Sequence, residues 1–97
     1  MVKKTWQEAC LRKAESIARL LISKQADYGK QNILDFGEFG ILVRSNDKFA
    51  RLKNLYNKEK PPQNESIRET WEDIAGYAIL ALMLIDKEFD LLFNEKK

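Results

Sequence analysis

The strongest constraint on the fold is a regular run of apolar residues in the last third of the chain. Its members recur at spacings of four, three, four, three and four positions: Ile67, Trp71, Ile74, Ala78, Ala81 and Ile85. This period places them on one face of an α-helix, which takes 3.6 residues per turn. The charge-free part, residues 74–85, is much shorter than the ~20 residues that a membrane-spanning helix needs. The run therefore predicts a helix that packs into a protein core.

Length and composition favour one all-α domain over residues 1–97. Hydrophobic residues make up 44% of the chain and charged residues 33%, as in soluble globular proteins. Only four glycines and two prolines occur, which favours long helices. We expect a bundle-like protomer of four to five helices. No apolar leader is seen at the N-terminus, so we expect a cytoplasmic protein.

The inventory of side chains excludes several kinds of chemistry. With one cysteine, Cys10, and no histidine, the chain cannot build a disulfide framework, a Cys/His zinc site or a Ser–His pair within one protomer. Any metal ion would be held by oxygen ligands, which points to Mg²⁺, Mn²⁺ or Ca²⁺. Seventeen basic and fifteen acidic residues give a net charge of +2, too balanced to suggest binding to polymeric nucleic acid.

The N-terminal segment contains a helix start and a helix stop. Thr5 and Glu8 have the spacing of a capping box, in which a hydroxyl and a carboxylate bond to backbone N–H groups. Apolar residues then recur on one face, which predicts a helix over about residues 5–26. Gly29 suits the left-handed position that ends many helices. Cys10 lies on the apolar face, and we expect it to be buried as a small hydrophobe.

The middle of the chain gives a less regular pattern. Residues 30–43 are rich in apolar side chains but are interrupted by glycines. We expect a short helical turn or an irregular packed segment there, with a strand as the alternative. Ser45 or Asn46 can then cap a helix that runs to about Asn57.

The remaining segments are a loop, a helix and a tail. Two adjacent prolines predict a solvated loop over residues 58–63. Asn64 or Ser66 caps the following helix, which runs to about Ile85. The tail over residues 86–94 carries three apolar side chains and can form a last helix that docks on a neighbour. So short a chain leaves apolar surface exposed, which predicts a homodimer or a higher homo-oligomer.

Three acidic residues are spaced at intervals of four around the start of the last long helix. Glu65, Glu69 and Asp73 would share one helix face, where like charges weaken the helix by about 0.2–0.5 kcal/mol per pair. A divalent cation is the simplest group to offset that repulsion, so these carboxylates and Glu72 are candidate Mg²⁺ ligands. The alternative is a solvated face whose acidic residues favour the helix N-terminus.

Three basic residues are spaced for a common helix face in the preceding segment. Arg44, Lys48 and Arg51 follow one another at intervals of four and three. Arginine offers phosphate a planar fork of donors, and lysine offers a point charge. A basic face opposite the acidic face would suit a Mg²⁺–polyphosphate ligand. Ordinary salt bridges between two helices would produce the same pattern.

Two residues near the first helix end are candidates for contact with a nucleobase. Tyr28 can stack on a base, and Asn32 can form hydrogen bonds with a base edge. The alternative is a helix end with a packed tyrosine. Trp71 belongs to the apolar seam, and we expect it in the core rather than in a stacking platform.

These features occur in a recognisable order along the chain. The ordered set is Asp27-Tyr28-Gly29, Gly40-Ile41, Arg44, Asp47-Lys48, Arg51-Leu52, Glu65-Ser66-Ile67, Glu69-Thr70, Asp73 and Tyr77. It resembles the small nucleotide modification associated domain family of bacteria and phages. That family is itself similar to the all-α NTP pyrophosphohydrolases of the MazG-like and dimeric dUTPase-like kinds. The resemblance covers about residues 24–84.

The resemblance implies an oligomeric helical protomer with a nucleotide site between helices. In active relatives, acidic residues on two helices hold Mg²⁺, and water splits the α–β linkage of a nucleoside triphosphate to release pyrophosphate. By position, Glu69 and Asp73 match the catalytic acidic pair, with Glu65 and Glu38 (or Asp47) as further metal ligands. The positions expected to bind the substrate are Arg44, Lys48, Arg51, Tyr28 and Asn32.

One departure keeps more than one function open. MazG-like enzymes carry a Glu-Glu-x-x-Glu cluster on the earlier helix, where this chain has Asn46-Asp47-Lys48-x-x-Arg51. From the resemblance as a whole we expect a Mg²⁺-dependent pyrophosphohydrolase acting on a free nucleoside polyphosphate in the cytoplasm of a bacterium or a phage-infected host. The alternatives are a protein that sequesters a nucleotide without cleaving it, and a helical oligomerisation module.

Overall fold

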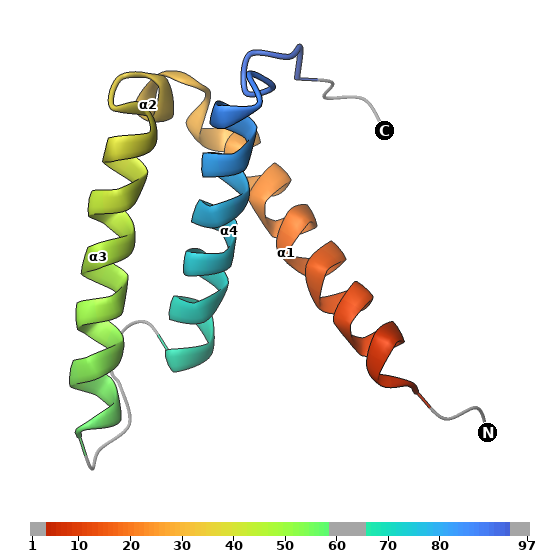
Figure 1. Cartoon of the computed structure of the whole chain (residues 1–97), viewed down its shortest axis with the longest axis vertical. Coiled ribbons are helices and arrows are strands. Elements are labelled where there is room, and N and C mark those ends of the chain that lie inside the picture. Colours follow the sequence, from red (N-terminus) through yellow and green to blue (C-terminus); the bar gives the residue numbers. More distant parts are fainter. Residues whose placement is uncertain (1–3, 59–65, 94–97) are drawn as a thin grey trace.

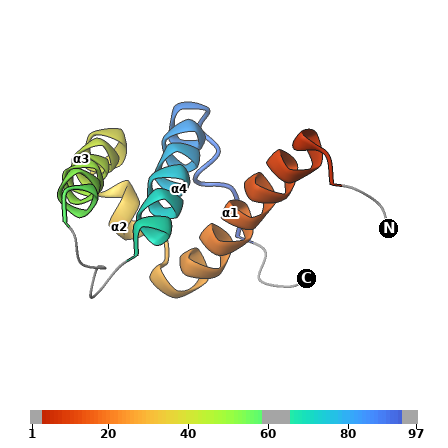
Figure 2. The ribbon, with the colours of Figure 1, turned by 90° about the horizontal axis from the view of Figure 1, so that it is seen from below.

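The computed structural model describes residues 4–58 and 66–93, which form four helices and no strand. The helices are α1 (Trp6–Tyr28), α2 (Gln31–Leu34), α3 (Gly37–Tyr56) and α4 (Ile67–Ile85). α3 and α4 pack side by side. The C-terminal half of α1 contacts α4, whereas the N-terminal half of α1 points away from α4 (Figures 1 and 2). The all-α prediction is confirmed. No helix in the described ranges combines the length and apolar character needed to span a bilayer.

The capping box and the end of α1 lie where the sequence predicts them. Thr5 Oγ1 accepts a hydrogen bond from the Glu8 backbone N–H at 3.1 Å, and Glu8 Oε1 accepts one from Thr5 N–H at 3.1 Å. Gly29 caps the other end by donating its N–H to Gln25 O at 2.9 Å. Its φ of 77° requires glycine, but its ψ of −171° sends the chain into an extended path rather than a left-handed helical one. Gly29 thus follows the helix as predicted, but the last helical residue is Tyr28, two residues beyond the predicted end.

α3 begins at Gly37, so the predicted helix start at Ser45 or Asn46 is wrong. Gly37 has a φ of 60°, which lets the chain turn sharply from α2 into α3. Gly40 lies in the first turn, where a Cβ would come 2.4 Å from Phe36 Cβ. The glycines therefore shape the α2–α3 corner instead of interrupting a helix. The strand alternative for this segment is wrong as well, since α2 and α3 occupy it.

α4 starts after Ser66, one of the two caps that the sequence suggests, and this start is a second capping box. Ser66 Oγ accepts a hydrogen bond from the Glu69 backbone N–H at 3.0 Å, and Glu69 Oε1 accepts one from Ser66 N–H at 2.9 Å. Thr70 lies in the next turn, fully buried, and its hydroxyl donates to Ser66 O at 2.8 Å. Three side chains thus stabilise the first turn of α4. Of the predicted loop before it (58–63), all but residue 58 lies outside the described residues.

The tail after α4 does not form the expected last helix within residues 86–93. Lys87 adopts a φ of 60°, and its N–H donates to Leu84 O at 3.1 Å. The Glu88 N–H donates to Met83 O at 2.8 Å, which completes a Schellman motif. This motif ends the helix and turns the chain back, so Phe89 is buried in the protomer's own core.

The core is small and lies where α2, the start of α3, the end of α4 and the tail meet. Its fully buried cluster is Ile33, Ile41, Leu80 and Phe89, and Leu21 of α1 is among the partly buried residues around it. α1 itself contains no buried residue.

Two burial predictions are wrong. Cys10 is exposed because the first half of α1 lies beyond the reach of α4. Trp71 is 48% exposed and lies at the edge of the α3–α4 pair. Its Nε1 donates to Tyr56 Oη at 2.9 Å, and its ring meets Phe49 edge-on at 6.5 Å between centroids.

Candidate functional site

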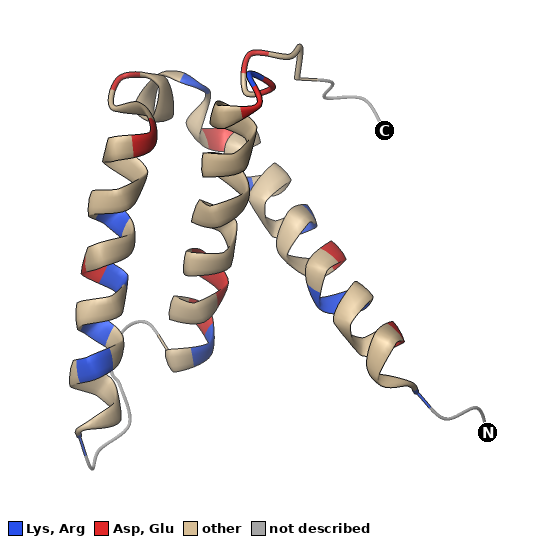
Figure 3. Cartoon of the chain, viewed as in Figure 1, with Lys and Arg blue, Asp and Glu red and all other residues tan. Residues whose placement is uncertain are grey.

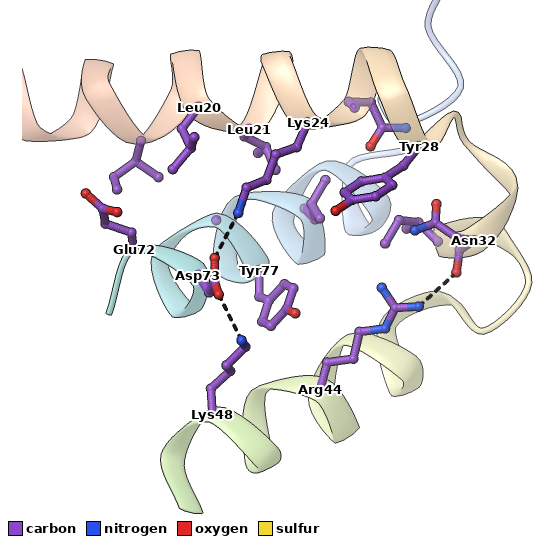
Figure 4. A pocket seen from close by; sticks show the side chains of 15 residues that line it. Leu20, Leu21, Lys24, Tyr28, Asn32, Arg44, Lys48, Glu72, Asp73 and Tyr77 are labelled. Carbon is purple, nitrogen blue, oxygen red and sulfur yellow. Dashed lines mark hydrogen bonds and ion pairs between the residues drawn. The ribbon is translucent and has the colours of Figure 1, made fainter. Parts of the chain in front are cut away.

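A cavity of about 300 Å³ lies between α1, α4 and the facing side of α2 and α3 (Figure 4). Its apolar wall consists of Ile17, Leu20, Leu21, Ile33 and Leu80. Its polar side chains are Lys24, Gln25, Tyr28, Asn32, Arg44, Lys48, Glu72, Asp73 and Tyr77. The volume is at the lower end of the range typical of small-molecule sites. An apolar wall beside a cluster of charges suits a ligand that has both an apolar and an anionic part.

The centre of the polar part is a carboxylate between two lysines. Asp73 Oδ1 lies 3.1 Å from Lys24 Nζ of α1, and Asp73 Oδ2 lies 2.8 Å from Lys48 Nζ of α3. The Asp73 and Lys48 side chains are 19% and 20% exposed, and Lys24 is 45% exposed. Asp73 itself is on α4, so these two ion pairs connect the three long helices.

The surroundings of Asp73 keep it ionised. Partial burial is the largest single effect and opposes the charged form. Hydrogen bonds from Lys48 and Lys24, together with their positive charges, outweigh burial and lower the pKa of Asp73 below its ordinary value. At neutral pH Asp73 is therefore a negatively charged carboxylate that lies between two lysine side chains.

Arg44 adds a third cation to the cavity. Its Nη2 donates to the backbone O of Asn32 at 3.4 Å, which links α3 to α2 (Figure 4). The Asn32 Oδ1 is buried and has no hydrogen-bond partner among the described residues. A buried acceptor without a donor is costly, so this atom would gain from a ligand that offers an N–H or O–H group.

The charges along the helices explain why the cavity is cationic. The basic residues of α3 lie between Arg44 and Lys53, whereas the charged residues of α4 precede residue 74 (Figure 3). Within the cavity, Lys24, Arg44 and Lys48 face Glu72 and Asp73. Three positive and two negative side chains leave a local charge of +1, which favours an anionic ligand.

The structure brings together six of the residues that the sequence suggested for the site. The cavity is lined by Tyr28, Asn32, Arg44, Lys48, Glu72 and Asp73. Their roles remain predictions, but their convergence depends on three helices and a short turn that lie far apart in the sequence.

The other suggested residues lie elsewhere. The Glu69 carboxylate is engaged in the N-cap of α4 and does not line the cavity. Arg51, one turn beyond Lys48 on α3, does not line it either. Glu38 borders a separate apolar groove between α3 and α4. Glu65 lies outside the described residues.

The described carboxylates do not fit a Mg²⁺ site in this arrangement. Within residues 4–58 and 66–93, no three acidic side chains come close enough to hold a metal ion together. Both oxygens of Asp73 face lysines, Glu69 caps a helix, and Glu72 lies 3.4 Å from Arg68. The metal-binding role suggested for Glu65, Glu69, Glu72, Asp73 and Glu38 therefore stays a prediction.

Lys24 is a cavity residue that the sequence interpretation missed. It lies on the same face of α1 as Ile17, Leu21 and Tyr28, at spacings of seven, three and four residues. A lysine within an otherwise apolar face is a signal that the face meets a charged partner. That signal alone did not identify Asp73, because the two residues are 49 positions apart.

Comparisons with known proteins agree with the position of the cavity in the chain. A family model described as "Nucleotide modification associated domain 1" matches residues 24–85. All the polar cavity residues, from Lys24 to Tyr77, lie within this match, whereas Ile17, Leu20 and Leu21 precede it. No curated protein and no solved structure matches the chain.

Proposed function

The chain belongs to the Nucleotide modification associated domain 1 family, and from this premise we propose that it binds a free nucleoside polyphosphate in the cavity between α1, α3 and α4. The observation that carries the proposal is the convergence of three cations, Lys24, Arg44 and Lys48, in one partly apolar cavity. A nucleotide likewise combines a polyanionic part with a flat, largely apolar part.

The three cationic side chains of the cavity suit phosphate. Arg44 can offer a planar pair of N–H donors to two phosphate oxygens, and the lysines can turn their ammonium groups toward others. Because Arg44 and Lys48 are partly buried, their interaction with an anion is screened less by salt than that of surface residues.

The apolar wall of the cavity suits a nucleoside. Leu20, Leu21 and Leu80 provide a wall, and the Tyr28 ring faces the cavity (Figure 4). The buried Asn32 Oδ1 can accept a hydrogen bond from a base N–H. This atom has no hydrogen-bond donor among the described residues, so the ligand would supply the missing one. These features favour a nucleotide over inorganic phosphate alone.

The proposal is tested with a panel of nucleoside mono-, di- and triphosphates, each incubated with the protein in EDTA or in Mg²⁺. Native mass spectrometry then reports both the bound ligand and any product. We expect at least one nucleotide to be retained intact in EDTA. Binding of none of them, in either condition, would overturn the proposal.

A charge-removing variant provides the residue-level test. Arg44→Met removes a charge-assisted interaction worth about 1.5–3 kcal/mol, which corresponds to a roughly 10–150-fold weaker Kd. Arg12→Met is the matched control, because Arg12 is an exposed residue of α1 outside the cavity. Equal affinity losses in the two variants would refute the assignment of Arg44 to the site.

A second candidate function is Mg²⁺-dependent release of pyrophosphate from the same ligand. It is favoured by Glu72 and Asp73, neighbouring carboxylates that both line the cavity. Hydrolysis would require Asp73 to leave its lysines for a cation. The same mass-spectrometric panel distinguishes this function, because it predicts a nucleoside monophosphate that forms only when Mg²⁺ is present.

We also propose that the protein associates with itself. Its proposed location is the cytoplasm, where free nucleotides are present. Trp6 and Leu11 of α1 are 78% and 70% exposed, and contact with a second copy would remove these large apolar side chains from water. Light scattering after size-exclusion chromatography, at several protein concentrations, tests it; a monomer at every concentration would contradict it.

A further inference from the structure

We propose that the Asp73 carboxylate is an internal substitute for a ligand phosphate: it holds Lys24 and Lys48 in place, and a bound phosphate group displaces it. This inference rests on the proposed nucleotide site and adds a mechanism of binding to it. Asp73 would then be a competitor of the ligand rather than one of its contacts.

The geometry around Asp73 is that of a bound anion. Each carboxylate oxygen has its own lysine, at 3.1 Å for Lys24 and 2.8 Å for Lys48, and the two ammonium groups approach from different helices (Figure 4). Charge-assisted N–H···O bonds to phosphate oxygens have the same lengths. A phosphate group also carries several oxygens that share negative charge on one central atom, so it can bridge the same two lysines.

Electrostatics make the two anions mutually exclusive. A phosphate close enough to contact both lysines would lie beside the Asp73 carboxylate, and two adjacent negative charges repel each other strongly in a partly buried site. The phosphate carries the larger charge and has Arg44 within the same cavity. The carboxylate is therefore the group that gives way, by rotating toward the open side of the cavity.

The exchange would also affect α1. α1 has no buried residue of its own, and its ion pair to α4 in the described structure is Lys24–Asp73. When phosphate replaces the carboxylate, Lys24 and Lys48 bind the ligand, so α1 is joined to α3 through the ligand instead of through α4. Ligand binding is thus expected to shift α1 relative to α4.

The inference has a test whose sign separates it from a metal-ligand role. If Asp73 held a cation for the phosphates, Asp73→Asn would weaken binding. If Asp73 competes with phosphate, Asp73→Asn would strengthen binding in EDTA. We expect the Kd of this variant for inorganic pyrophosphate, and for the best nucleotide of the panel, to fall by about tenfold or more in isothermal titration calorimetry at low ionic strength.

Glu69→Gln is the matched control. It removes the same charge from the same helix, one turn away, but Glu69 is engaged in the N-cap and lies outside the cavity. Glutamine can also fill the capping-box position, so the fold is retained. Long-range attraction of the anion rises equally in both variants, and only the local competition differs. Equal affinities of the two variants, or weaker binding by Asp73→Asn, would overturn the inference.

A measurement on the unmodified chain avoids dependence on the stability of the variant. The carboxyl ¹³C resonance of Asp73 is expected to shift as pyrophosphate saturates the site, because the carboxylate loses both lysines. The Glu69 carboxyl resonance is expected to stay in place. An unmoved Asp73 resonance at saturation would refute the displacement while leaving the nucleotide site itself intact. Failure of the unmodified chain to bind any nucleotide or pyrophosphate would overturn both proposals together.

Discussion

Replacing Gly76 by alanine is expected to stabilise the fold, whereas the same replacement at Gly40 is expected to destabilise it. Glycine in a helix interior costs about 0.5–1 kcal/mol relative to alanine, because the unfolded chain loses more freedom on folding. At Gly76 in α4, the added Cβ would meet Leu21 Cδ1 at 3.7 Å, an ordinary van der Waals contact. The variant should therefore retain the whole gain of about 0.5–1 kcal/mol.

At Gly40 the same gain is opposed by a clash. The added Cβ would lie 2.4 Å from Phe36 Cβ and 3.5 Å from Phe36 Cγ. A Cβ cannot rotate away from its own backbone, so the α2–α3 corner itself would have to move. Overpacking of this kind costs about 1–3 kcal/mol. The helix-propensity gain is common to both sites, so the free energies of unfolding of the two variants should differ by the cost of the clash, about 1–3 kcal/mol.

Thermal and urea unfolding followed by far-UV circular dichroism measures the difference. For a chain of this size, 1 kcal/mol corresponds to a Tm change of about 4–8 °C, so the two variants should be separated by at least about 4 °C. All samples must have the same protomer concentration, because self-association would raise Tm by mass action. Equal shifts of both variants in the same direction would refute the proposed role of Gly40 in the corner.

Three further predictions concern the cap, the core and the acid response. Ser66→Ala should lower the free energy of unfolding by about 1 kcal/mol through loss of the N-cap acceptor. Ser66→Asn retains an acceptor, so it should lower the free energy of unfolding much less. Equal losses in the two variants would contradict the cap assignment. Leu80→Ala should cost about 2–5 kcal/mol, because Leu80 is 5% exposed and belongs to the core cluster; a loss below 1 kcal/mol in urea titrations would show that the core is packed differently. Because its folded pKa is lowered, Asp73 contributes stability that is present above its unfolded pKa, near 3.8, and is lost as pH falls through the lower folded value. Urea titrations over this acid range should show a smaller pH dependence for Asp73→Asn than for the parent chain, and identical slopes would refute the ion-pair assignment.

Local patterns in the sequence were sufficient to predict α1 and α4. The period of the apolar residues identified both helices; a capping box marked the start of α1 at Thr5, and the start of α4 was narrowed to Asn64 or Ser66, of which Ser66 is the cap. These features depend on residues within three or four positions of one another, so each can be evaluated before the rest of the chain is placed. Arg44 and Lys48 have the spacing of a common helix face, but the helix predicted from Ser45 or Asn46 left Arg44 outside, and both are helical because α3 begins at Gly37.

Local patterns failed where a residue serves the packing of distant segments. Gly40 was interpreted as an interruption, but it allows the close approach of Phe36 at the α2–α3 corner. Trp71 belongs to an apolar seam and is nevertheless 48% exposed, even though its ring contacts Phe49 of α3. Periodicity shows which residues share a face, but it does not show how far a neighbouring helix covers them.

The sequence by itself determined that this chain is helical, where its first and last long helices begin, and which charges share a helix face. The tertiary structure alone decided which of those charges meet. Glu69 and Asp73 are one turn apart on α4, yet the first is engaged at the N-cap and the second lies between two lysines from other helices. The physical reason is range: caps and faces depend on backbone geometry within one or two turns, whereas an ion pair between Lys24 and Asp73 depends on the angle at which two whole helices pack.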